Sequence, residues 1–232
     1  MPTTPAQNPL DDPAADPFEI AREAAAQLAA ATGVEKHDIA LTLGSGWGKA
    51  ADLIGETTHT IPATEIVGFS ASKVVGHSGT LRSILLPDGK RALVIGARTH
   101  YYELGLAAEG HNVRRVVHSV RTAAAAGATT MILTNGAGGI KASWKPGTPV
   151  LISDHINLTA ASPLEGATFV DLTDLYSQRL RDLARTVDAT LDEGVYVQFR
   201  GPQYETPAEV LQAGKAAEAA LGVLLAKIVA EL

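Results

Sequence analysis

Two glycine-rich segments, 44–48 (Gly-Ser-Gly-Trp-Gly) and 135–139 (Asn-Gly-Ala-Gly-Gly), each follow a short apolar run. Glycines and short side chains let backbone N–H groups approach an anion closely, and a following helix N-terminus would add its dipole. The spacing of 44–48 excludes a P-loop, a dinucleotide-binding fingerprint and a nucleophile elbow. Segment 44–48 could be an anion-binding loop or a plain tight turn. Segment 135–139 could bind an anion, or its glycines could serve only a backbone that requires positive φ. These residues alone leave both alternatives open.

A cluster of polar side chains occupies residues 98–103 (Arg-Thr-His-Tyr-Tyr-Glu), directly after the apolar run 91–95. It combines a fixed cation, a titratable ring and two phenols. On an extended backbone Arg98, His100 and Tyr102 would share one face, as a single polyanionic ligand requires. The alternative is a salt-bridged loop in which Arg98 pairs with Glu103 or another carboxylate.

An aromatic residue and an acid stand together in the segment 201–206 (Gly-Pro-Gln-Tyr-Glu-Thr), after a predicted strand over 195–199. Tyr204 beside Glu205 would suit a heterocycle that carries N–H donors. Glu205 could equally cap, or place an acid in the first turn of, the helix that begins beyond Thr206. From these residues alone the capping role is favoured.

The composition is that of a globular protein, with 46% hydrophobic and 19% charged residues among 232. A net charge of -6 gives no electrostatic footprint for nucleic acid or an anionic membrane, so a bound anion must be held locally. The absence of cysteine excludes disulfides, thiolate catalysis and Cys-containing metal sites. The sequence shows no signal peptide and no run long enough to cross a bilayer, which predicts a cytoplasmic protein.

Hydrophobic periodicity and turn signals predict an α/β protein in which strands alternate with helices and run into glycine-rich segments. Asp-Gly between the second and third strands predicts a hairpin. The predicted helices cover 17–32, 108–126, 174–190 and 213–232, and the predicted strands cover 39–43, 81–86, 91–95, 129–134, 149–153 and 195–199. We expect a flexible N-terminal arm over 1–15 and a single domain over 16–232.

Six motifs in chain order resemble the trimeric, 6-oxopurine-preferring class of purine nucleoside phosphorylases. They are 43–48, 76–81, 98–103, 134–139, 154–158 and 201–206, and the match spans roughly 40–209 and the last helix. The resemblance implies an α/β domain with a mixed, twisted, partly barrel-like sheet flanked by helices. It also implies a pentosyltransferase of purine salvage that cleaves purine ribonucleosides or deoxyribonucleosides with phosphate. The expected products are a free base and a pentose 1-phosphate. A homotrimer is implied, with inorganic phosphate as co-substrate and no metal or organic cofactor.

The resemblance also implies the site residues, taken position by position. The phosphate would contact Ser45, His77, Arg98, Thr99, His100 and the backbone N–H of Gly136. The nucleoside would contact Tyr102, Asn135, Ala137, Gly138, Tyr204 and Glu205. His100 and Glu205 are the expected catalytic residues, with His100 acting as a donor because phosphate is already an anionic nucleophile. Glu205 would accept the N1–H of hypoxanthine or guanine, which adenine lacks, so it favours inosine or guanosine over methylthioadenosine.

The sequence departs from the family pattern after residue 206. A strand and crossover that would carry a base-binding Asn, on the order of 30 residues or more, are missing near 207–213. Either the chain lacks them or the numbering runs across an omitted loop. We expect the second, because a lost central strand would uncover sheet hydrogen bonds, and a break between Thr206 and Lys215 would reveal it. Methylthioadenosine phosphorolysis and ligand binding without turnover are the competing functions.

Overall fold

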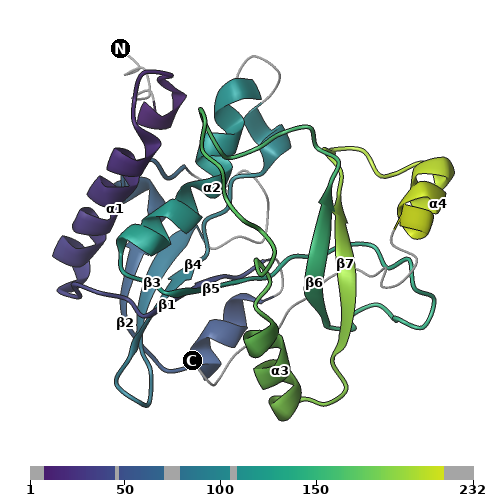
Figure 1. The fold of residues 1–232 in the computed structure, drawn as a ribbon. Helices are drawn as coiled ribbons and strands as arrows, with labels where there is room; N and C mark the ends of the chain where they lie inside the picture. The colour runs from purple at the N-terminus through teal and green to yellow at the C-terminus, as the bar shows by residue number, and fades with distance from the viewer. Residues whose placement is uncertain (1–7, 45–46, 71–78, 105–108, 217–232) are drawn as a thin grey trace. The chain divides into compact units, whose positions relative to one another are not determined.

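The computed structural model describes residues 8–44, 47–70, 79–104 and 109–216 (Figure 1). The chain divides into two compact units, Met1–Leu133 and Thr134–Leu232, and each is described here by itself. Within the described ranges, none of the helices combines the length and apolar character needed to cross a bilayer. Ser45 and His77, two predicted phosphate ligands, lie outside the described residues.

The first unit is built on an open five-stranded sheet with the strand order β2-β3-β4-β1-β5. Its strands are β1 (Ile39–Thr42), β2 (Glu56–Pro62), β3 (Thr80–Leu85), β4 (Arg91–Ile95) and β5 (Thr130–Leu133). β2, β3 and β4 pair antiparallel, whereas β4, β1 and β5 pair parallel. The sheet is therefore mixed as predicted, and a barrel-like closure is not confirmed among the described strands.

Two helices, α1 (Pro17–Thr32) and α2 (Glu109–Ala125), pack against each other in the first unit (Figure 1). α1 begins as predicted, because the Asp16 side chain accepts the Phe18 N–H at 2.8 Å and Pro17 occupies the first turn. It ends at Gly33, whose φ of 66° is left-handed. Buried residues of both helices and of four strands form the main core: Ala24, Leu28, Ala40, Ile61, Leu81, Leu93, Ile95 and Ala123.

Residues 8–15 belong to the arm that the sequence predicts to be flexible, yet they are packed against α2. Leu10 is fully buried within the 3-10 helix Pro9–Asp11. Arg115 of α2 forms an ion pair with Asp11, and Arg114 donates to the carbonyl oxygens of Asp12 and Ala15 at 2.9 and 3.0 Å. Burial of one leucine and pairing of two arginines fix this segment, which composition alone does not indicate.

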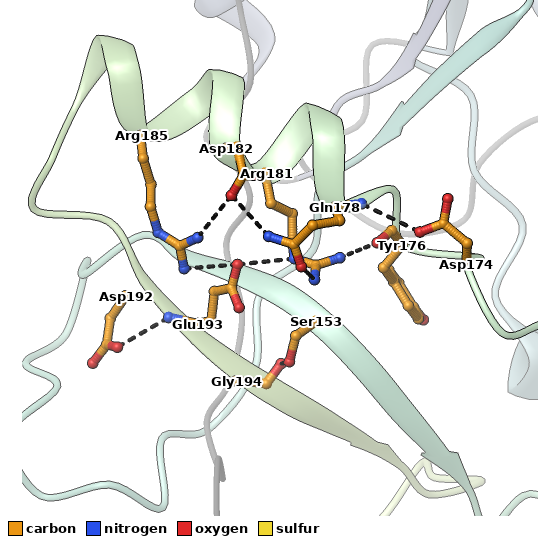
Figure 2. Close-up of polar contacts among 10 residues, drawn as sticks. All are labelled: Ser153, Asp174, Tyr176, Gln178, Arg181, Asp182, Arg185, Asp192, Glu193 and Gly194. Atoms are coloured by element: carbon orange, nitrogen blue, oxygen red, sulfur yellow. Dashed lines mark hydrogen bonds and ion pairs between the residues drawn. The ribbon is translucent and has the colours of Figure 1, made fainter.

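The second unit contains a parallel two-stranded sheet of β6 (Val150–Asn157) and β7 (Asp192–Gln198), connected through α3 (Gln178–Val187). A small core of Leu151, Ala184 and Leu191 joins helix and strands. α3 is also attached to β7 by charge: Arg181 and Arg185 both contact the Glu193 carboxylate, at 2.8 and 2.7 Å (Figure 2). The last helix of the described part, α4 (Pro207–Ala216), follows, and residues 217–232 of the helix predicted over 213–232 lie outside the described residues.

Most predicted elements are present, and the differences are local. α3 is shorter than the predicted helix over 174–190, β6 runs beyond the predicted strand over 149–153, and β2 was not predicted. α4 runs from Pro207 to Ala216, and the missing segment near 207–213 stays a prediction. The single domain over 16–232 stays a prediction.

Candidate active site

The parallel strands of the first unit end together at one edge of the sheet. The β1 residue Thr42 pairs with Ile95 of β4 and Leu133 of β5, so the carboxyl ends of the three strands are level. In open α/β sheets ligands bind beyond this edge. The predicted segments 44–48 and 98–103 follow β1 and β4 there, which supports the sequence-based choice of site.

The segment after β1 forms a turn in its described part. Trp47 donates its N–H to the carbonyl oxygen of Gly44 at 3.1 Å, and the 3-10 helix Gly48–Leu53 begins directly afterwards. Ser45 and Gly46 lie outside the described residues. The turn is thus observed, and the anion-binding role of Ser45 stays a prediction.

His100 is held by Glu103 in the segment after β4. The Glu103 Oε1 accepts the His100 backbone N–H at 2.7 Å and also contacts the His100 Nδ1. Only 6% of the Glu103 side chain is exposed, against 23% for His100, so the acid lies behind the ring. Because a carboxylate accepts, the Nδ1 carries a proton and donates it to Glu103.

Tyr102 stacks on His100, with ring centroids 5.4 Å apart and ring planes at 20°. The two rings therefore share one face as predicted, although Tyr101–Leu104 is a 3-10 helix rather than extended backbone. Tyr102 is 46% exposed, which leaves one of its sides open to a sugar or a second ring. Arg98 and Thr99 precede this pair and are both half-buried.

In the second unit the glycines of 135–139 do not require left-handed backbone. Positive φ values occur at other glycines, such as Gly147 at 86°, but not at Gly136, Gly138 or Gly139. A methyl group added to Gly136 or Gly138 would meet no atom of the described structure within 4 Å. The alternative of a positive-φ requirement is therefore wrong, and the open space beside this backbone suits a ligand.

Glu205 does not cap the helix that follows it. Thr206 and Glu209 form the capping box of α4: the Thr206 N–H donates to Glu209 Oε2 at 2.7 Å, and the Glu209 N–H donates to Thr206 Oγ1 at 3.3 Å. Glu205 itself is exposed, and its neighbour Tyr204 is 94% exposed. The capping alternative is thus wrong, and both side chains are available to a ligand.

The motif at 154–158 has a structural contact of its own. The Tyr176 hydroxyl lies 3.1 Å from the His155 Nδ1, and the two rings meet edge to face. Burial, followed by the nearby Asp154 and Tyr196, raises the pKa of Tyr176 to about 12. The phenol therefore stays protonated and can donate to His155, which ties β6 to the segment before α3.

Comparison with known proteins gives the family. The model of the phosphorylase superfamily matches residues 38–225. A purine nucleoside phosphorylase from Cellulomonas sp is 63% identical over 216 residues, covering 91% of this chain and 74% of that protein. The chain belongs to the purine nucleoside phosphorylases of the phosphorylase superfamily.

Other phosphorylases agree with this membership. The purine nucleoside phosphorylase of Mycobacterium tuberculosis is 52% identical, covering 87% of this chain and 72% of that protein. Isoform 2 of the Schistosoma mansoni purine nucleoside phosphorylase, solved with cytosine and ribose-1-phosphate, superimposes with a TM-score of 0.72 and 30% identity. That superposition covers 86% of this chain and 73% of the solved one. The chain thus spans about three quarters of the length of these relatives.

The sequence did not reveal one contact of the segment after β4, because Glu103 was considered only as a partner for Arg98. The structure shows Glu103 in contact with His100. The signal was present in the spacing, because an acid three residues after the start of a turn can accept that residue's N–H. The predicted residues fall into two groups, Arg98 to Tyr102 in the first unit and the remaining described ones in the second, and their convergence on one ligand stays a prediction.

Proposed function

We propose that the chain catalyses the reversible phosphorolysis of purine nucleosides to a free base and a pentose 1-phosphate. Membership of the purine nucleoside phosphorylases supports the reaction, as do the solved relatives that bind ribose-1-phosphate. The observation in this chain that carries the proposal is the His100 imidazole, oriented by a buried Glu103 beyond the end of β4. A ring held in this way has a fixed orientation, and in its imidazolium form the second ring N–H would donate to an oxyanion.

The phosphate site of the proposal combines fixed charge, side-chain donors and main-chain donors. Arg98, Thr99 and His100 supply it from the segment after β4, together with Ser45 and His77. The backbone N–H of Gly136 completes it without any side chain. Phosphate then acts as the nucleophile, and these donors hold its charge beneath the sugar. Each such donor is commonly worth about 3–4 kcal/mol of transition-state stabilisation.

The base site gives the proposed preference for 6-oxopurines. Glu205 can accept the N1–H of hypoxanthine or guanine and the exocyclic amine of guanine, and the capping box of α4 leaves it uncommitted. Tyr204 would pack on the purine or the sugar, Tyr102 would face the ribose, and the segment Asn135, Ala137 and Gly138 would line the base. Inosine and guanosine are therefore the proposed substrates.

Bond cleavage follows from charge placement. As the glycosidic bond lengthens, the sugar takes on oxocarbenium character, and the phosphate anion stabilises it from below. Negative charge passes to the departing purine, and the base site would accommodate it. We further propose that this works without metal or organic cofactor, in a cytoplasmic homotrimer.

The deciding experiment is a coupled assay of hypoxanthine release from inosine, with and without inorganic phosphate. We expect release only with phosphate, and formation of ribose 1-phosphate in equal amount. Phosphate-independent release would identify a hydrolase instead. Faster cleavage of methylthioadenosine than of inosine would overturn the 6-oxopurine assignment.

A second candidate, nucleoside binding without turnover, applies if the segment that would carry a further base-binding Asn is truly deleted after residue 206, where the sequence departs from the family pattern. Calorimetric titration of inosine and of hypoxanthine separates the two. Binding of both with no release of base in the presence of phosphate would establish the second function.

A further inference from the structure

Trp144 makes a set of contacts at the end of the glycine-rich segment 135–139 that the proposed reaction does not use. Its indole Nε1–H donates to Asp192 Oδ2 at 2.8 Å. Lys141 forms an ion pair with the same carboxylate and lies 4.9 Å from the indole ring centre. A methyl group placed on Gly139 would lie 4.0 Å from both the Cβ and the carbonyl oxygen of Trp144. The backbone and Cβ of Trp144 thus lie beside the last glycine, at the distance where a methyl group on it would make contact.

The carboxylate that holds the indole belongs to a fixed element. Asp192 is the first residue of β7, where it pairs with Val150 of β6. Its other carboxylate oxygen accepts the Glu193 N–H at 3.0 Å, as Figure 2 shows. The Glu193 side chain is in turn held by Arg181 and Arg185 of α3. The hydrogen bond to Asp192 therefore restrains Trp144, because the acceptor is fixed in β7 and cannot move with the segment that carries Trp144.

A second contact reaches the same place from α4. A methyl group placed on Gly214 would lie 3.9 Å from Ile140 Cγ2, and the adjacent Ala213 is only 2% exposed. Ile140 directly follows Gly139. The helix that begins just after Tyr204 and Glu205 therefore packs on the end of the glycine-rich segment. Within the second unit, both proposed base-binding segments share this support.

We propose that Trp144, held by Asp192, is a positioning residue that fixes the nucleoside-binding end of the segment 135–139. The inference rests on the proposed function of that segment. Trp144 lies against Gly139, which is adjacent to Gly138 but three residues from Gly136. Loss of the restraint should therefore disturb the base contacts more than the phosphate contact.

The test uses the full chain and the variants Trp144→Phe, which removes only the N–H donor and part of the ring, and Asp192→Asn. Asp188→Asn is the matched control, because Asp188 is another exposed aspartate of this unit and only closes a turn with Thr190. Saturation kinetics with inosine and with phosphate are measured for each. Calorimetric titration of hypoxanthine gives base binding without turnover.

We expect the inosine KM of Trp144→Phe to rise about fivefold, because phenylalanine cannot make the hydrogen bond to Asp192, while the phosphate KM stays within about twofold. Hypoxanthine affinity should fall by the same factor, with a smaller change in Asp192→Asn and none in Asp188→Asn. A lower kcat with both KM values unchanged would indicate a merely structural role and overturn the proposal. Equal increases in both KM values would also overturn it. Inactivity of the unmodified chain would refute the proposed function instead, and the hypoxanthine titration would still test Trp144.

Discussion

The contact between His100 and Glu103 yields a prediction whose size follows from the structure. Glu103→Gln keeps an oxygen acceptor of the same shape but removes the negative charge. Two hydrogen bonds reach the same carboxylate oxygen, from the His100 backbone N–H and Nδ1. A bond to a charged group contributes about 1.5–3 kcal/mol and a neutral one about 0.5–1.5 kcal/mol, so the substitution weakens each by roughly 1 kcal/mol.

Two bonds weakened in this way amount to roughly 2 kcal/mol, which corresponds to at most about a 30-fold loss if it is fully expressed in the transition state. The carboxylate is only 6% exposed, so water cannot replace the lost charge effectively. We expect kcat/KM for phosphate to fall by about 5- to 30-fold. Phosphate-saturation kinetics of inosine cleavage measure it, with Glu65→Gln, an exposed glutamate of the same unit, as the control.

A double-mutant cycle with His100→Ala identifies the route of the effect. If Glu103 acts through the imidazole, Glu103→Gln should cost little more once that ring is removed. An undiminished loss in the His100→Ala background would refute the reasoning, as would a loss within twofold in the unmodified background.

Three further predictions concern single features of the two units. Glu205→Gln should reduce kcat/KM for inosine by about 10- to 100-fold, with the melting temperature unchanged, because an exposed acceptor of the base is lost; full retention of inosine activity would remove Glu205 from the site. Gly136→Ala should leave phosphate KM within about twofold and raise stability by about 0.4–1 kcal/mol, because its φ is not left-handed and a methyl group meets open space; a large rise in KM would place the ligand differently. Burial lowers the pKa of His37 and of His118 to about 4, so the unfolded chain binds more protons than the folded one between that value and about 6.5. Stability should therefore be full above that window and fall by up to about 3 kcal/mol per histidine as the pH decreases through it. Urea unfolding at pH 7 and at pH 4.5 measures this difference in unfolding free energy. A difference that is as large in His37→Leu as in the unmodified chain would contradict the prediction.

Local sequence rules predicted the regular elements where the signal is short-range. The helix over 17–32 is correct at both ends, because Asp16, Pro17 and Gly33 act within their own turns. The hairpin between the strands β3 and β4 is also confirmed, since Asp-Gly requires only its neighbours. The packed segment 8–15 was not predicted, because its contacts with Arg114 and Arg115 join residues about a hundred positions apart.

For the site, the sequence by itself determined the residue types and their order: the ordered motifs predicted the family, and the comparisons confirm it. It could not determine which donors each carboxylate accepts from. Glu103 holds His100, Glu209 rather than Glu205 caps α4, and Asp192 holds Trp144. Many donors are interchangeable in a linear sequence, whereas in the folded chain burial and distance select the partners of each carboxylate. Only the tertiary structure makes that choice, because a hydrogen bond depends on positions in space and not on separation along the chain.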